Sequence, residues 1–225
     1  MRLDKYLCDN LEYSRSEIKK YIKSGEVSID DVICRDSAVN VNEQNNITFR
    51  GKCVKYKQYR YFLLNKPAGF VTATRDTKAP FVMELINEPN KGRLFPVGRL
   101  DKDTEGLLLI CDDGELAHKL LSPKKHVDKT YYVLADKPLS EKDISLLEKG
   151  VDIGDKLPTA PAKADLISDR ELRLTITEGR FHQVKRMLRA VDNEVIYLKR
   201  ISFGRLSLPD DLKIGEYIEV EAKDI

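Results

Sequence analysis

Charged residues crowd the approach to one apolar segment of the 225-residue chain. The segment is residues 107–111 (LLLIC), and Arg99, Asp101 and Asp103 precede it. Its length and the Asp-Asp-Gly turn at 112–114 predict a buried strand, so the residues before it are held against the core. A carboxylate fixed there can act as a nucleophile or a general base. The plainer alternatives are that Asp101 or Asp103 caps a turn or pairs with Arg99, and the two carboxylates could also form a hydrolytic pair.

A second segment, residues 129–133 (KTYYV), alternates in a way that predicts a strand. Successive side chains of a strand point to opposite faces, so Tyr131 and Tyr132 face different sides. One tyrosine then packs in the core and the other is free to stack on a nucleobase. Burial of both tyrosines in the core is the alternative.

The third segment, residues 178–188 (EGRFHQVKRML), reads as a strand end, a turn and a helix. Apolar residues at helical spacing leave Lys185, Arg186 and Arg189 off the buried stripe, where they can meet phosphate or a carboxylate. His182 stands alone near the helix start, and we expect it to form a hydrogen bond or contact RNA rather than bind a metal.

Composition favours an anionic partner. The net charge is only +2, yet residues 50–60 hold five basic and no acidic residues, and residues 180–205 hold seven basic residues against two acidic ones. Such patches suit a polyanion, although a solvated face is the alternative.

The four cysteines and three histidines are scattered, which predicts neither a disulfide framework nor a zinc site. No apolar stretch reaches membrane-spanning length and no secretory signal opens the chain, so we expect a cytoplasmic location with no membrane association.

Two domains are predicted, with residues 1–55 as a small α/β unit, 56–60 as a linker and 61–225 as a larger domain. In the first unit, Ser14 and Glu17 form a capping box that begins a helix, and Gly25 suits its end. On this helix Arg15, Lys19 and Lys23 repel one another at four-residue spacing. A polyanion lying along them would relieve the repulsion, and simple solubility is the alternative.

The larger domain is predicted to be of the α/β (α+β) class, with a mixed, largely antiparallel sheet flanked by helices. Several connections are too short for parallel crossovers, which favours antiparallel pairing. The expected strands are 61–65, 107–111, 130–135, 172–177 and 195–201, and the expected helices are 115–121, 140–149 and 182–191.

These segments together resemble a known family. Residues 1 to about 48 are similar to an S4 RNA-binding domain through residues 2–7 (RLDKYL), 14–16 (SRS) and 22–27. The rest resembles the catalytic domain of the RsuA/RluB/RluE/RluF family of pseudouridine synthases. Residues 98–108 (GRLDKDTEGLL) resemble its aspartate motif, 129–131 (KTY) its tyrosine motif and 178–187 (EGRFHQVKRM) its basic motif.

The resemblance implies roles for individual residues. Asp101 would be the catalytic carboxylate, Tyr131 would stack on the flipped uracil, and Lys185 would pair with Asp101 and keep it ionised. Arg99 would help to hold the RNA. The isomerisation is redox-neutral and adds no atoms, so neither a cofactor nor a metal is expected. The other RNA-binding candidates are Arg2, Arg15, Lys19, Lys23, His182 and Arg186.

The residues around Lys185 resemble the small-subunit branch of the family, which implies that uridine 516 of 16S rRNA is the substrate. A large-subunit rRNA pseudouridine synthase is the first alternative. The second is a non-catalytic S4 protein that acts in ribosome assembly, against which the presence of Asp101, Tyr131 and Lys185 argues. We expect a monomer that binds ribosomal RNA or an assembling small subunit.

Overall fold

The computed structural model describes residues 1–88, 90–122 and 125–225. It divides into two compact units, one made of residues 1–59 with 87–92 and the other of 60–86 with 93–225. The predicted linker, 56–60, spans the chain boundary between them. The grouping of 87–92 with the first unit depends on contacts between residues far apart in the sequence, such as the hydrogen bond from Asn90 Nδ2 to Cys8 O.

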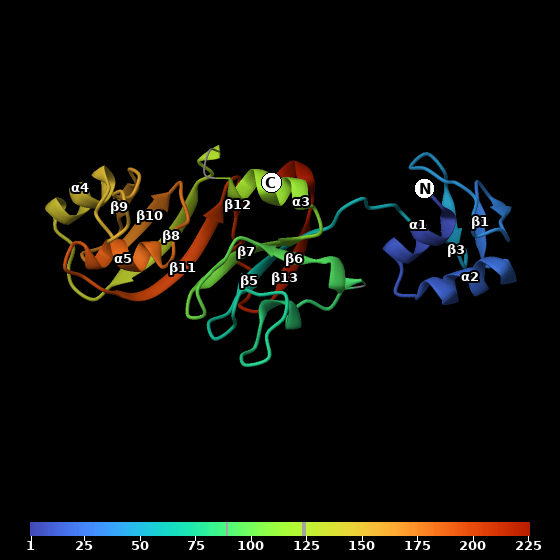
Figure 1. Ribbon diagram of the computed structural model, residues 1–225, viewed down its shortest axis with the longest axis horizontal. Coiled ribbons are helices and arrows are strands. Elements are labelled where there is room, and N and C mark those ends of the chain that lie inside the picture. Colours follow the sequence, from blue (N-terminus) through green and yellow to red (C-terminus); the bar gives the residue numbers. More distant parts are fainter. Residues whose placement is uncertain (89, 123–124) are drawn as a thin grey trace. The chain divides into compact units, whose positions relative to one another are not determined.

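The first unit packs two helices against a small sheet (Figure 1). The helices are α1 (Leu3–Asn10) and α2 (Arg15–Ser24). The sheet is antiparallel in the order β2 (Val32–Ile33), β1 (Val27–Ile29), β3 (Ile47–Phe49) and β4 (Lys52–Cys53). Its core includes Leu3, Leu7, Ile18, Ile22 and Ile47. Ile18 and Ile22 therefore place one face of α2 in this core.

Local sequence signals explain where α2 begins and ends. Ser14 accepts a hydrogen bond from the backbone of Glu17, and the Glu17 side chain accepts one from Ser14 N, which confirms the predicted capping box. Gly25 ends the helix with φ 85°, a left-handed conformation that glycine adopts without a steric cost. Asp30 and Asp31 both have positive φ between β1 and β2, as a tight two-residue hairpin loop requires.

The second unit is built on a nine-stranded mixed sheet. Its main strand order is β13 (Tyr217–Val220), β5 (Tyr61–Lys66), β7 (Glu105–Cys111), β11 (Val195–Phe203), β8 (Lys129–Ala135), β10 (Glu171–Ile176) and β9 (Lys163–Leu166). Off this path, β6 (Phe95–Val97) pairs with β7, and β12 (Leu206–Ser207) pairs with β11. The β7–β11 pair is parallel and the other described pairs are antiparallel. The predicted class and the largely antiparallel sheet are confirmed.

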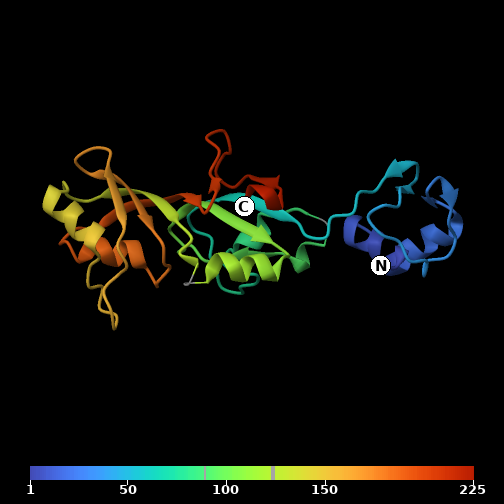
Figure 2. The ribbon, with the colours of Figure 1, turned by 90° about the horizontal axis from the view of Figure 1, so that it is seen from above.

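The helices of this unit lie on both faces of its sheet. They are α3 (Gly114–Leu121), α4 (Glu141–Lys149) and α5 (Gln183–Arg189), and short 3-10 turns occur at Val82–Glu84 and Ala222–Asp224. A further 3-10 turn, Lys91–Arg93, lies at the boundary between the two units in the chain. In Figures 1 and 2 the long strand β11 runs from the part that holds α4 and α5 to the part that holds β7 and α3. None of the described helices combines the length and apolar character needed to cross a membrane.

Strand β7 is apolar from Leu107 to Cys111 because both of its faces are buried there. Leu108 and Ile110 belong to the core that includes side chains of α4 and α5. Leu107 and Leu109 belong to the core that includes side chains of α3. This strand therefore fixes the loop that precedes it from both sides, as the sequence predicted.

Gly106 lets β7 and β11 approach closely next to that loop. It has φ 97°, and a Cβ atom built there would lie 2.3 Å from Arg200 O. A side chain at this position would push the two strands apart. The absence of a Cβ at Gly106 therefore helps to set where the Asp101 loop enters the sheet.

Candidate active site

The loop that carries Asp101 is held by hydrogen bonds to its backbone. Thr72 Oγ1 donates to Leu100 O at 2.7 Å and accepts from Leu100 N at 3.1 Å. The backbone N–H of Gly69 donates to Lys102 O at 2.7 Å, and that of Thr104 donates to Asp101 O at 3.1 Å. The loop is thus anchored immediately before and after Asp101.

Lys66 is a further anchor that the sequence analysis missed. Lys66 is the last residue of β5, one position beyond the expected strand 61–65, and it is fully buried. Its ammonium lies 3.0 Å from Asp101 O and 2.8 Å from Thr104 O, and it also contacts the carbonyls of Pro67 and Lys102. Burial lowers the pKa of Lys66 to about 8, against the opposing effect of nearby carboxylates. A lysine directly after an apolar strand was the sequence signal that could have found it.

The carboxylate of Asp101 meets two groups from the start of α5. Lys185 Nζ lies 3.3 Å from Asp101 Oδ2, and His182 Nε2 lies 3.6 Å from Asp101 Oδ1. The Asp101 side chain is 27% exposed, so it is fixed by the protein and still reachable from solvent. The pairing of Lys185 with Asp101, which the resemblance implied, is present in the structure.

Lys185 also binds a second carboxylate. Its Nζ lies 2.6 and 2.8 Å from the two oxygens of Asp103, which are closer than Asp101. Desolvation raises the pKa of Asp103, but the hydrogen bond and charge of Lys185 outweigh it, and the pKa lies below its ordinary value. The Asp103 side chain is 71% exposed. Asp103 is therefore a second partner of Lys185 at the outer edge of the site.

Tyr131 lies on the same face of the sheet as these groups. It is 8% exposed and belongs to the core cluster that contains Leu100 and Val184, which are neighbours of Asp101 and Lys185 in the sequence. Its hydroxyl has no hydrogen-bond partner among the described residues, and no hydrogen bond joins it to Asp101. Tyr132 points to the other face, where its hydroxyl bonds to Glu171 and its ring contacts Tyr197 edge-on. The predicted division of the two tyrosines between opposite faces is confirmed.

The remaining candidates near Asp101 differ in how their charges are engaged. Arg99 is exposed, and its side chain forms no ion pair within the described part of the chain. Arg186, in contrast, donates to the carbonyls of Ile153 and Phe181 and to Asp155. Its guanidinium is used inside the protein, so contact of Arg186 with RNA stays a prediction that this geometry does not favour.

In the first unit, three of the predicted RNA-binding cations converge on one buried carboxylate. Asp4 is fully buried and lies 3.0 Å from Arg2, 3.2 Å from Arg15 and 4.0 Å from Lys19. The hydrogen bond from Arg2, followed by that from Arg15, lowers the pKa of Asp4 against the effect of desolvation. Asp4 therefore relieves part of the repulsion expected on α2 within the chain itself, and contact of these cations with RNA stays a prediction. Three cations and one carboxylate still leave two net positive charges.

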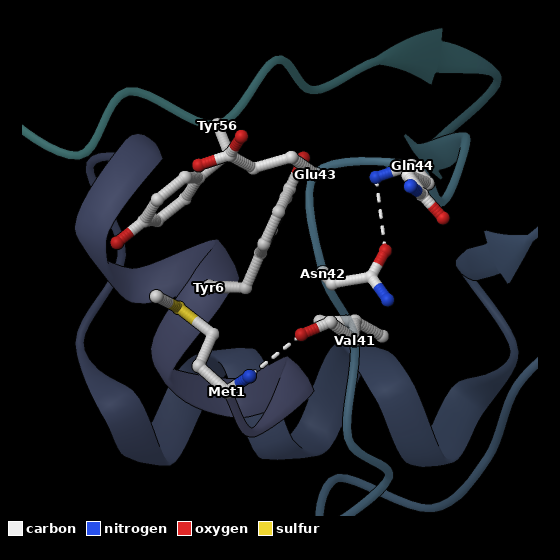
Figure 3. A pocket seen from close by; sticks show the side chains of 7 residues that line it. All are labelled: Met1, Tyr6, Val41, Asn42, Glu43, Gln44 and Tyr56. Atoms are coloured by element: carbon white, nitrogen blue, oxygen red, sulfur yellow. Dashed lines mark hydrogen bonds between the residues drawn. The ribbon is translucent and has the colours of Figure 1, made fainter.

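The first unit also contains a pocket of about 400 Å³. Figure 3 shows Tyr6 and Tyr56 at its wall, with ring centroids 5.2 Å apart, and the amine of Met1 bonded to Val41 O. Asn42, Glu43 and Gln44 complete the lining. No lysine or arginine is among the described residues that line the pocket.

Across the described residues, no group of three or more His, Cys, Asp or Glu side chains could hold a metal ion.

Comparison with known proteins identifies the family. Residues 60–190 match the family model described as RNA pseudouridylate synthase. The chain belongs to the RNA pseudouridine synthase family. Residues 1–47 match the S4 domain model, so the predicted combination of an S4 domain with a pseudouridine synthase domain is confirmed.

Relatives match over the full length of this RNA pseudouridine synthase. An uncharacterized RNA pseudouridine synthase, YtzG, of Bacillus subtilis is 46% identical over 100% of this chain and 97% of its own length. The ribosomal small subunit pseudouridine synthase A of Yersinia pestis is 40% identical over 100% of this chain and 97% of its own length. A crystal structure of a pseudouridylate synthase aligns with a TM-score of 0.71 at 37% identity, covering 100% of this chain and 97% of that one. The chain is therefore an isomerase with the fold of this family.

Proposed function

We propose that this RNA pseudouridine synthase modifies uridine 516 of 16S rRNA and that Asp101 is its catalytic carboxylate. The observation that carries the proposed role of Asp101 is the geometry around it. Lys185 and His182 meet its two oxygens, and Lys66 holds the backbone of its loop. A reactive group held in this way needs little rearrangement to reach its reacting geometry.

The reaction is an isomerisation within one nucleotide. The bond between N1 of uracil and C1′ of ribose breaks, the ring turns, and a bond forms between C5 and C1′. C5 then loses a proton and N1 gains one, so the composition is unchanged. In this proposal, Asp101 acts as the nucleophile or as the base in these steps, and the chemistry requires neither metal nor cofactor.

The proposed substrate contacts follow from the surroundings of Asp101. Tyr131 would stack on the extruded uracil, and its unbonded hydroxyl is consistent with a position at the edge of the substrate site. Arg99 is exposed and forms no ion pair among the described residues, so its charge is available to RNA. Extruding a nucleotide costs a few kcal/mol, which RNA contacts must offset. The excess charge around Asp4 supplies such contacts in the first unit.

The choice of substrate rests on relatives that carry a functional name. Those from Yersinia pestis and Escherichia coli, at 40% and 38% identity, are named ribosomal small subunit pseudouridine synthase A. The proposal includes action as a monomer in the cytoplasm on rRNA or an assembling small subunit.

Mapping pseudouridine in rRNA from cells that lack the gene tests this substrate. We expect the modification at uridine 516 to disappear and to return with the wild-type gene but not with Asp101→Asn. Loss at a position in large-subunit rRNA would favour that alternative. An unchanged rRNA pattern would favour a non-catalytic role in assembly.

Lys185 is expected to act on turnover more than on RNA binding. Lys185→Met removes the cation beside Asp101, and we expect the single-turnover rate at saturating RNA to fall on the order of 100-fold. Lys185→Arg should retain part of the activity because it keeps the charge. Asp103→Asn is the matched control, since it removes the other, exposed partner of Lys185 and should keep most of the activity. Equal losses of affinity and turnover in Lys185→Met would reassign this lysine to phosphate contact.

The cations of α2 are expected to contribute affinity without chemistry. Replacing Lys19 and Lys23 with Gln should weaken RNA binding and flatten the slope of log affinity against log salt by about one unit per lost phosphate contact. The rate at saturating RNA should change little. Lys142→Gln, at an exposed lysine of α4, is the control for loss of a positive charge elsewhere. A salt slope that matches the wild type would show that these lysines only solvate the surface.

A further inference from the structure

An aromatic ring lies open to solvent beside the proposed catalytic carboxylate. Phe181 is 74% exposed, and its ring stacks on His182 with centroids 3.8 Å apart and planes 18° apart. His182 in turn contacts Asp101 at 3.6 Å. Asp101, the imidazole and the phenyl ring therefore form a continuous series that ends in an uncovered apolar surface.

The turn that carries Phe181 is firmly held. Arg186 Nη1 donates to Phe181 O at 3.1 Å, and the backbone N–H of Arg180 donates to Gln183 Oε1 at 2.9 Å. The Arg180 guanidinium also donates to the carbonyls of Leu157 and Pro158. These bonds hold the backbone of the turn, and the ring that it carries is not covered by the core.

His182 adopts a strained backbone conformation within this turn. Its φ is 48°, in the left-handed region that side chains other than glycine enter at a cost. Strain of this kind persists where the surrounding structure enforces it, and it is concentrated at functional sites. Here it accompanies the stacking of His182 on Phe181 and its contact with Asp101.

We propose that the Phe181–His182 stack is the platform on which the RNA base next to the target uridine stacks when that uridine is extruded. This inference rests on the proposed function, because it requires an extruded target nucleotide at Asp101. Extrusion leaves a neighbouring base without its stacking partner, and a flat aromatic ring replaces that partner. Because every base has a π-face, the platform accepts any base and supplies affinity rather than sequence reading.

The positive charge of Arg99 favours an RNA strand, rather than a protein surface, as the ligand that binds beside Asp101. The exposed Arg99 is two residues from Asp101 in the same loop, and its guanidinium has no ion-pair partner in the described ranges. It is available to bind the phosphate that links the extruded nucleotide to its neighbour. An aromatic ring and a free cation beside one reaction site are the two groups that a single strand requires.

The platform can be tested with RNA oligonucleotides that span the uridine identified by rRNA mapping and carry 2-aminopurine at the adjacent position. In an Asp101→Asn background, binding should alter the 2-aminopurine emission through stacking, and Phe181→Ala should abolish that change. With Asp101 intact, Phe181→Ala should raise the KM for RNA about 5- to 150-fold, equivalent to about 1–3 kcal/mol of stacking. Phe181→Tyr keeps an aromatic face and should stay near the wild-type values.

The test of the platform has one control variant and two results that would overturn the proposal. Leu166→Ala removes an exposed apolar side chain from edge strand β9 and should change neither measurement. Phe181→Ala with a wild-type emission change would overturn the platform, even if turnover fell, because the ring would then act only on His182 and Asp101. A defect seen only when ribosomal proteins are present would also overturn it and assign the ring to a protein partner. Failure of the wild type to modify any rRNA would instead refute the proposed function.

Discussion

Asp101→Asn is expected to abolish pseudouridine formation while leaving folding and RNA affinity close to those of the wild type. Asparagine keeps the shape of the side chain but removes its charge and its capacity to act as a nucleophile or base. We expect the single-turnover rate to fall at least about 1000-fold. The measurement is pseudouridine formed in rRNA under saturating enzyme, together with the Kd for the same RNA.

The structure gives this prediction an internal control. The loop backbone is held through carbonyls of Asp101 and Thr104 and through Leu100, and the substitution alters none of them. A loss of activity in Asp101→Asn would then reflect the carboxylate and not the loop. Turnover near the wild-type rate would remove Asp101 from the mechanism.

Lys66→Met is expected to reduce both activity and stability, although the hydrogen bonds that its ammonium donates to the described residues all go to backbone carbonyls. Methionine has a similar length but no donor, so the carbonyls of Asp101 and Thr104 would lose their buried partner. An unsatisfied buried group costs about 1–3 kcal/mol, and a displacement of about 1 Å at a reacting group can lower a rate about 100-fold. We expect a loss of that order in kcat and a fall in the free energy of unfolding of about 2 kcal/mol. Lys102→Met, on an exposed lysine of the same loop, should change neither quantity much.

The contributions of Lys66 to the free energy of unfolding and to kcat should change in opposite directions as the pH rises. Its pKa is lowered in the folded protein from 10.5 to about 8, so between these values the unfolded chain binds more protons than the folded one. The contribution of Lys66 to the free energy of unfolding therefore rises as the pH rises through this window, because the cost of burying a charge disappears. Over the same window the neutral amine has fewer N–H donors for the loop, so kcat should fall above about pH 8.

Parallel unfolding and kinetic series on the wild type and Lys66→Met test these opposite changes. The difference in unfolding free energy between the two proteins should move in favour of the wild type from pH 8 to 10. The alkaline fall in kcat should be absent from the residual activity of Lys66→Met. A difference in stability that is constant with pH would show that Lys66 does not titrate with a lowered pKa.

The sequence by itself determined the main elements and the order of the motifs. The apolar run of β7, the alternation around Tyr131 and the capping box at Ser14 are patterns of neighbouring residues, and each depends on interactions within one element. Because side chains repeat about every two residues along a strand and about every 3.6 residues along a helix, the sequence pattern also predicts which side chains face the core. The pairing of Lys185 with Asp101 came from the resemblance, which carries information about tertiary structure that the local pattern lacks.

Only the tertiary structure decided the partners of long polar side chains. Lys66 lies 35 positions from Asp101, and Lys185 lies 82 positions from Asp103, so no local pattern indicates either contact. Asp4 lies in the first turn of α1, and only the packing of α1 beside α2 makes it the shared partner of Arg2 and Arg15. A flexible charged side chain can reach many partners, and its choice depends on which buried acceptors the folded backbone brings within about 3 Å. The sequence therefore indicated the candidate reactive groups, and the fold determined how they are held.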